Sequence, residues 1–79
     1  MFYVYVLTSE RGETYIGFSG DLRRRLGEHN AGKNVSTRGR QWVLTYYEAY
    51  RTEKLARDRE RILKGHGRSK QALLKRLTD

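Results

Sequence analysis

Two short runs of aromatic and β-branched residues stand at the start of the chain, with a polar, glycine-containing segment between them. They cover residues 2–7 and 14–18. Such side chains favour strands, and two strands joined by a short turn-forming segment make an antiparallel hairpin. Because side chains alternate across a strand, we expect Tyr3 and Tyr5 to share one face of this hairpin.

The residues after the hairpin alternate between helix and strand patterns. Ser19-Gly20-Asp21 is typical of a helix start, since a short polar side chain can accept hydrogen bonds from the free N–H groups of the first turn. After this signal the sequence predicts, in order, a helix to about Asn30, a loop over 31–41 and a strand over 42–50. A second helix, which Thr52 could cap, is expected to extend to Lys64, and a third helix is expected to begin at Ser69.

Helical spacing predicts which side chains face the sheet. Leu22 and Leu26 lie one turn apart, and Arg25 and His29 are expected to flank the stripe that they form. In the second helix, Glu60 is expected at the edge of an apolar side that consists of Leu55, Ala56, Arg59, Ile62 and Leu63.

The chain is strongly basic. Seventeen Lys and Arg against nine Asp and Glu give a formal net charge of +8 on 79 residues. Between Arg23 and Arg40 the sole acidic residue is Glu28, so the positive charge is concentrated around the first helix and the loop after it. A basic patch of this kind attracts polyanions, of which nucleic acid is the commonest. A basic protein without a nucleic-acid partner is the plainer alternative.

Length and composition narrow the class of protein. A chain of 79 residues can build one modest core, so we expect a single domain over residues 1–79. There is no cysteine, which excludes a disulfide framework and a thiolate zinc site. The apolar start is too short for a signal-peptide core, and no segment approaches the roughly 20 apolar residues of a membrane span. A cytoplasmic location is therefore expected.

Several motifs, taken in order, resemble the GIY-YIG nuclease family. Tyr3-Val4-Tyr5 and Tyr15-Ile16-Gly17 stand about ten residues apart, and the matching segments 21–26, 28–30, 42–48 and 56–60 follow, with Lys64-Gly65 after them. They look like the small stand-alone members related to the excision-repair nuclease domain, over nearly the whole chain. The resemblance implies an α+β fold in which about three helices flank a three-stranded antiparallel sheet.

The same resemblance implies a site. Its catalytic residues are Tyr5, Tyr15, Arg25 and Glu60, with His29 as a further member, and Glu60 is expected to hold Mg²⁺ or Mn²⁺. DNA is the expected substrate, and RNA stays open. The side chains and backbone expected to contact nucleic acid are Tyr3, Gly17, Arg23, Arg24, Asn30, Lys33, Arg38 and Arg40.

These residue types suit the hydrolysis of a phosphodiester. A single carboxylate with several waters is a common way to hold Mg²⁺, which fits Glu60. The planar guanidinium of Arg25 can pair two phosphate oxygens. We expect Tyr15 to position or deprotonate the attacking water, with Tyr5 as a hydrogen-bonding partner. His29 is expected to relay a proton or to contact phosphate.

Other interpretations of the same residues stay open. The chain could be a catalytically weak or inactive nucleic-acid-binding module of the same fold, or a structural or regulatory protein. Glu60 could be a surface carboxylate paired with Lys64 one turn on. Gly17 is expected to let the substrate backbone approach the strand closely. We expect low sequence specificity. The substrate could be branched, nicked or damaged DNA, which would link the protein to repair or recombination. A homodimer, or a partner protein that supplies specificity, also stays open.

Overall fold

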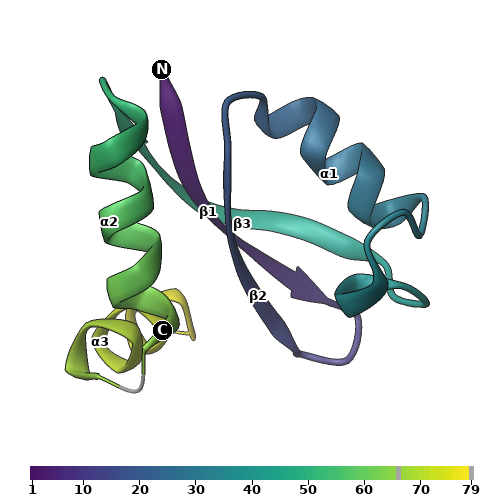
Figure 1. Ribbon diagram of the computed structural model, residues 1–79. Coiled ribbons are helices and arrows are strands. Elements are labelled where there is room, and N and C mark those ends of the chain that lie inside the picture. The colour runs from purple at the N-terminus through teal and green to yellow at the C-terminus, as the bar shows by residue number, and fades with distance from the viewer. Residues whose placement is uncertain (66, 79) are drawn as a thin grey trace.

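The chain folds into one antiparallel sheet flanked by helices (Figure 1). The computed structural model describes residues 1–65 and 67–78. The strand order is β2-β1-β3, and the expected α+β fold is confirmed. The elements along the chain are β1 (Phe2–Ser9), β2 (Thr14–Ser19), α1 (Leu22–Asn30), the 3-10 helix η1 (Val35–Thr37), β3 (Trp42–Tyr50), α2 (Glu53–Lys64) and α3 (Arg68–Thr78).

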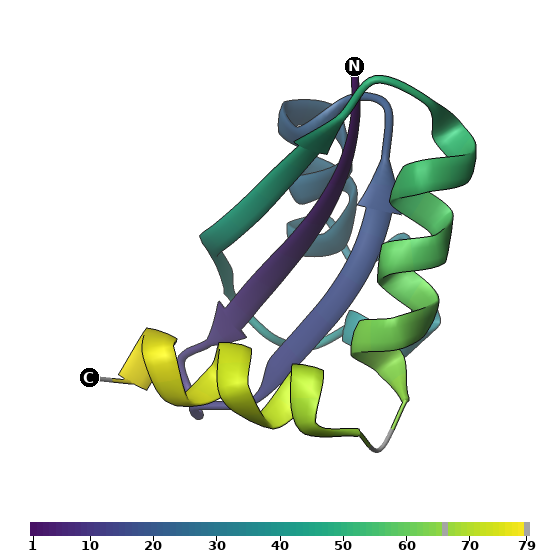
Figure 2. The same cartoon turned by 90° about the vertical axis from the view of Figure 1, so that its left-hand side faces the viewer.

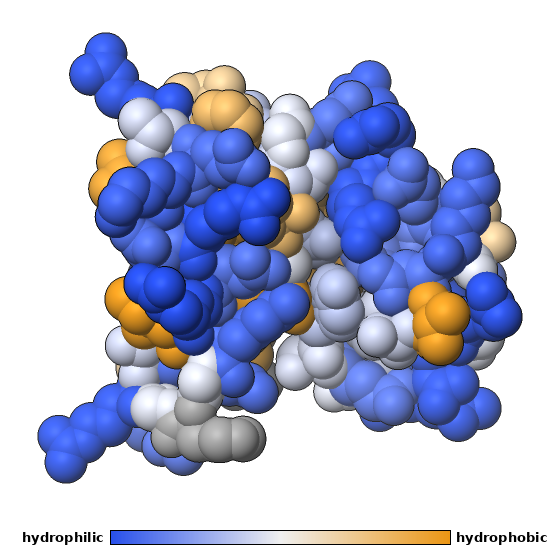
Figure 3. Space-filling model, viewed as in Figure 1, coloured by the Kyte–Doolittle hydropathy of each residue, from blue (hydrophilic) through white to orange (hydrophobic). Residues whose placement is uncertain are grey.

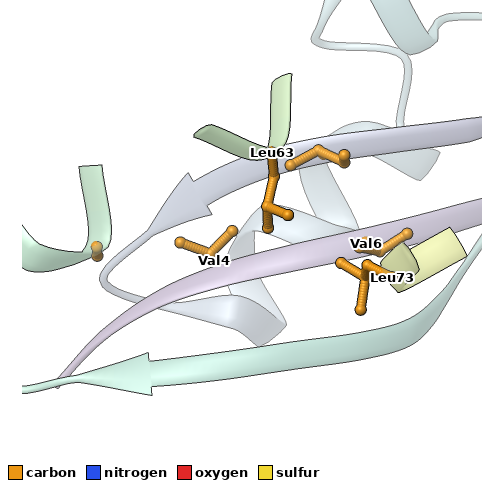
Figure 4. Packing of buried hydrophobic residues seen from close by; sticks show 6 residues of the cluster. Val4, Val6, Leu63 and Leu73 are labelled. Carbon is orange, nitrogen blue, oxygen red and sulfur yellow. The ribbon is translucent and has the colours of Figure 1, made fainter. Parts of the chain in front are cut away.

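The two faces of the sheet carry different helices. Figures 1 and 2 show α1 on one side of the sheet and α2 with α3 on the other. Alternation along β1 supplies a buried core to each face. Tyr5, Leu7 and Trp42 form the core beneath α1. On the opposite face the core consists of Val4, Val6, Ile16, Ala56, Leu63 and Leu73, part of which Figure 4 shows from close by.

Capping residues set where the helices begin. The side chain of Asp21 accepts a hydrogen bond of 3.1 Å from the backbone N–H of Arg24 at the start of α1. The hydroxyl of Thr52 accepts one of 3.2 Å from the backbone N–H of Leu55 at the start of α2. Both starts confirm the capping residues expected from the sequence. In the described part of the chain, no helix has the length and apolar character needed to cross a membrane.

Two expectations about the helices and loops are corrected. The segment 31–41 is not wholly irregular, because it contains η1. Leu55 and Ile62 were expected on the apolar side of α2, but they are 51% and 50% exposed. The buried stripe of α2 is narrower and consists of Ala56 and Leu63, which lie seven positions apart. Each exposed side chain precedes a buried one by one position, and one residue turns the direction of the side chain by about 100°.

A carboxylate links β3 to α2. Glu48 accepts hydrogen bonds from the hydroxyls of Tyr46 at 2.7 Å and Tyr50 at 2.6 Å. It also accepts two from the guanidinium of Arg59, at 2.8 and 3.1 Å. Burial alone raises the pKa of Glu48, but these hydrogen bonds outweigh it and lower the pKa to about 2.

We expect this carboxylate to make the folded state sensitive to acid. Because its pKa is depressed in the folded state, its contribution is complete above the ordinary value of 4.5 and is lost as pH falls through about 2. The shift corresponds to about 3 kcal/mol. Urea unfolding at a series of pH values should show a difference between wild type and Glu48→Gln that shrinks as pH falls through this range. Glu53→Gln, on an exposed carboxylate, is the control, and a pH-independent difference for Glu48→Gln contradicts the assignment.

Candidate active site

A line of hydrogen-bonded side chains runs beneath α1. The hydroxyl of Tyr5 lies 2.9 Å from Nε2 of His29, and Nδ1 of His29 lies 2.7 Å from the hydroxyl of Thr37. The relative exposures of Tyr5, His29 and Thr37 are 2%, 0% and 1%. β1, α1 and η1 thus each supply one member of a network that is closed to solvent.

The network assigns the proton of His29. The hydroxyl of Thr37 donates to the backbone carbonyl of Asn34 at 3.4 Å, so its oxygen accepts from Nδ1–H of His29. Nε2 is then free to accept from the hydroxyl of Tyr5. Burial lowers the pKa of His29, and the charge of Arg25 lowers it further. The imidazole is therefore neutral at pH 7.

Tyr5 is held in its protonated form. Burial raises its pKa to about 12, although a hydrogen bond from the Arg25 guanidinium opposes the rise. The pKa of Arg25 is raised, and the largest cause is its ion pair with Glu28. Burial lowers this pKa, and Tyr5 raises it by a smaller amount. The ion pair measures 3.0 Å between Nη1 and Oε1. The guanidinium thus interacts with both Glu28 and Tyr5.

Tyr15, Arg25 and Glu60 are the members of the predicted site that stay accessible. Each is half-buried, and they come from β2, α1 and α2. The hydroxyl of Tyr15 has no hydrogen-bond partner among the described residues. Every buried polar side-chain atom in the described part of the chain does have a partner. The hydroxyl of Tyr15 is therefore not buried and reaches solvent. The ring of Tyr15 packs edge-on against His29, with centroids 4.8 Å apart.

The three accessible groups meet at the edge of the sheet formed by β2. Lys64 joins two of them, because its ammonium lies 3.1 Å from Oε2 of Glu60 and 5.6 Å from the centre of the Tyr15 ring. The charges of Glu60 and Arg25 both act on the hydroxyl of Tyr5. Figure 3 shows hydrophilic surfaces over α1 and α2, with residues of intermediate and hydrophobic character between them.

This arrangement corrects one expectation for His29. Contact with a substrate phosphate is wrong for the folded protein, because the ring is fully buried and both of its nitrogens are engaged. The paired-carboxylate interpretation of Glu60 is partly right, since the pair with Lys64 is present. Its partner Lys64 also lies near the ring of Tyr15, and the side chain of Glu60 is 19% exposed.

The side chains expected to contact nucleic acid differ in their surroundings. Arg23, Arg24 and Lys33 are exposed. Arg38 donates to the carbonyl of Gly32 at 3.0 Å, and Arg40 pairs with Glu13 at 2.6 Å. Tyr3 packs edge-on against Tyr47 on the face of α1, with ring centroids 5.9 Å apart.

Two of the residues expected to contact nucleic acid make contacts within the fold. The side-chain amide of Asn30 bonds both backbone groups of Trp42, with Nδ2 donating at 3.0 Å and Oδ1 accepting at 2.6 Å. It therefore fixes the start of β3. Gly17 does not face open space, because a Cβ at this position would overlap Cζ and the hydroxyl oxygen of Tyr5. The glycine makes room for a side chain of the site rather than for substrate.

The sequence did not point to Thr37. It lies in a segment expected to be a loop, where a buried side chain has no periodic pattern to reveal it. Its backbone carbonyl also accepts a hydrogen bond of 2.9 Å from the indole N–H of Trp42. The indole thus anchors η1, and η1 brings the hydroxyl of Thr37 to His29.

Comparison with known proteins identifies the family. Residues 1–73 match the family model described as the GIY-YIG catalytic domain. The chain belongs to the GIY-YIG family. Membership implies a nuclease-type function on DNA, and GIY-YIG nucleases generally depend on a divalent metal ion.

The relatives are small GIY-YIG proteins. A UPF0213 protein of Haloquadratum walsbyi is 39% identical over 74 residues, which cover 91% of this chain and 83% of that protein. A UPF0213 protein of Bacillus pumilus is 40% identical over 73 residues, which cover 90% and 74%. The solution NMR structure of a UPF0213 protein from Bacillus halodurans is 34% identical, with a TM-score of 0.58, over 98% of this chain and 85% of that one.

The carboxylate expected to hold a metal ion is that of Glu60. The described residues contain no group of three His, Cys, Asp or Glu side chains that could hold a metal. Mg²⁺ commonly binds through one or two carboxylates together with waters and substrate phosphates. The single carboxylate of Glu60, half-buried and paired with Lys64, is compatible with that mode of binding.

Gly17→Ala is expected to disturb the GIY-YIG site and to destabilise the fold. The added Cβ would overlap the Tyr5 ring, and the buried Tyr5 cannot move without breaking its bond to His29. Overpacking of this kind lowers the unfolding free energy by about 1–3 kcal/mol. Urea unfolding measures the loss. Gly27→Ala is the control, because nothing lies within 4 Å of a Cβ there. Equal losses in both variants contradict the explanation.

Proposed function

We propose that this protein is a divalent-metal-dependent endonuclease that hydrolyses DNA phosphodiester bonds with low sequence specificity. The observation that carries the proposal is the meeting of Tyr15, Arg25 and Glu60 at one edge of the sheet, from three different elements. A phenol, a guanidinium and a carboxylate suit the water, the phosphate and the metal of this reaction. A link to repair or recombination, through a nicked or branched substrate, belongs to the same proposal.

In the proposed mechanism each accessible side chain has one task. The oxygen of Tyr15 orients the attacking water or takes its proton. The guanidinium of Arg25 pairs the phosphate oxygens and neutralises the charge that grows as the water oxygen bonds to phosphorus and the ester bond breaks. Glu60 would hold the metal ion, which when bound supplies Lewis-acid stabilisation of the phosphate and of the leaving oxygen.

The buried residues support this trio from behind. Tyr5, with a pKa near 12 and 2% exposure, is a hydrogen-bonding partner rather than a base. His29 accepts from Tyr5 and packs against the ring of Tyr15. Thr37 holds the tautomer of His29. The sequence-based division of roles between the two tyrosines therefore stands as part of the proposal.

Removal of the metal tests the proposal directly. Supercoiled plasmid and nicked, branched and single-stranded oligonucleotides are incubated with Mg²⁺, with Mn²⁺ and with EDTA. We expect nicking with either ion and none with the chelator, and restored nicking when the ion is added back. Tight DNA binding without cleavage under any of these conditions would instead favour the inactive binding module.

Salt should affect binding more than sequence does. The basic residues around α1 are exposed, and phosphate contacts are sequence-independent. We expect the affinity for unrelated DNA sequences to be similar and to fall steeply as salt rises. Fluorescence anisotropy with two unrelated duplexes over a salt series measures the sequence dependence and the salt dependence of the affinity. An affinity that does not change with salt contradicts binding through phosphate contacts.

A further inference from the structure

A recess lies beside Tyr15 on the side away from Arg25. Thr14, Tyr15 and Ile16 of β2 form one wall, and Lys64 at the end of α2 and Lys70 in α3 form the other. Its volume is about 140 Å³, several times the roughly 30 Å³ that one water molecule takes in the liquid. The recess therefore shares a wall with the proposed active site, and its two lysines come from α2 and α3.

The charge in this recess is not balanced. The ammonium of Lys64 is paired with Glu60 at 3.1 Å, so these two groups cancel. Lys70 is half-buried, and among the described residues no carboxylate lies within ion-pair distance of its ammonium. A partly desolvated cation without a partner favours the binding of an anion. Counting the described residues alone, the recess carries one uncompensated positive charge next to Tyr15.

We propose that this recess binds a backbone phosphate that neighbours the phosphate to be cleaved. The inference rests on the proposed nuclease function. Phosphates follow one another at about 3.4 Å of axis along each strand, so a strand whose scissile phosphate lies at Tyr15 brings a further phosphate to Lys70. The nucleic acid would then be held from both sides of the cut, by the patch around α1 and by the recess between α2 and α3.

The salt dependence of DNA binding separates this contact from general charge. Binding of a fluorescein-labelled single-stranded DNA is measured by anisotropy in EDTA over a salt series. Lys70→Gln should make the slope of log affinity against log salt shallower by about 0.7, the value for one phosphate contact on a single strand. Lys70→Arg should keep the wild-type slope.

The control variant carries the same change in net charge. Lys54→Gln removes a lysine that is 83% exposed in the first half of α2, where it pairs with Asp58. It should leave the slope unchanged. Circular dichroism and thermal unfolding check that all variants fold alike. The proposal that the recess binds a phosphate is overturned if folded Lys70→Gln keeps the wild-type slope. It is also overturned if Lys54→Gln reduces the slope equally.

The outcomes distinguish this inference from the function on which it rests. If wild type shows metal-dependent cleavage but the slope is unchanged in Lys70→Gln, the proposed nuclease function stands and phosphate binding by the recess is rejected. If the slope is reduced in Lys70→Gln but wild type cleaves no DNA, the recess is a phosphate contact of a DNA-binding protein and the proposed nuclease function is rejected. No binding of DNA by wild type rejects both.

Discussion

Replacing Glu60 with glutamine is expected to reduce metal-dependent DNA cleavage by about 10³-fold or more, because Lewis-acid stabilisation contributes several kcal/mol and 1.4 kcal/mol is a factor of ten. Glutamine keeps the size of the side chain but removes the charged oxygen that a hard ion prefers. DNA binding in EDTA should persist or tighten slightly, since a negative charge leaves a basic surface. Plasmid nicking and anisotropy measure the two effects separately.

A matched carboxylate on the same helix provides the control. Glu53 pairs with Arg57 one turn on, as Glu60 pairs with Lys64. Glu53→Gln therefore breaks an equivalent i,i+4 pair far from Tyr15, and such a pair stabilises a helix by only about 0.2–0.5 kcal/mol. Cleavage by this variant should match wild type. If Glu60→Gln cleaves as well as Glu53→Gln does, Glu60 is a surface carboxylate and the metal lies elsewhere.

Tyr15→Phe is expected to slow cleavage by about 10²–10⁴-fold, the usual contribution of general acid–base catalysis. Its hydroxyl contacts solvent and bonds no described residue, so its removal should leave the melting temperature unchanged. The packing of the ring against His29 and Trp42 is kept by phenylalanine. Single-turnover cleavage rates and thermal unfolding of the same samples measure both quantities.

Tyr5→Phe provides the contrast within the same hairpin. It removes a buried hydroxyl and leaves Nε2 of His29 without a donor, which costs about 1–3 kcal/mol of stability. Tyr5→Phe should therefore lower stability, whereas Tyr15→Phe should lower activity alone. Tyr47→Phe, at an exposed tyrosine of β3, should change neither. A full rate with Tyr15→Phe would remove Tyr15 from the chemistry and leave the phosphate and metal groups to account for catalysis.

Much of this molecule follows from local pattern. Alternation along residues 2–7 determines that Tyr3 and Tyr5 share a face, and the short polar side chains of Asp21 and Thr52 mark where two helices begin. These features depend on neighbours within a few residues, so the printed sequence is enough to predict them. The family follows in the same way, because the spacing of its motifs along the chain is itself the evidence.

Tertiary packing decided what local pattern could not. The sequence marks Leu55 and Ile62 of α2 as apolar, yet only the narrow contact between α2 and the sheet determines that they are exposed while Ala56 and Leu63 are buried. From the sequence, Gly17 was expected to let the substrate backbone approach the strand. Only the position of Tyr5 on the neighbouring strand shows that the glycine makes room for a tyrosine ring.

The division of the site into buried and accessible groups also comes from the fold alone. Tyr5 and Tyr15 are the same residue type in similar strands, but the central strand β1 is covered by α1 while β2 lies at the edge of the sheet. Thr37 reaches His29 only because Trp42 and Asn30 tie the intervening segment to β3. Burial and long-range hydrogen bonds depend on residues distant in sequence, and a single sequence does not reveal which of them meet.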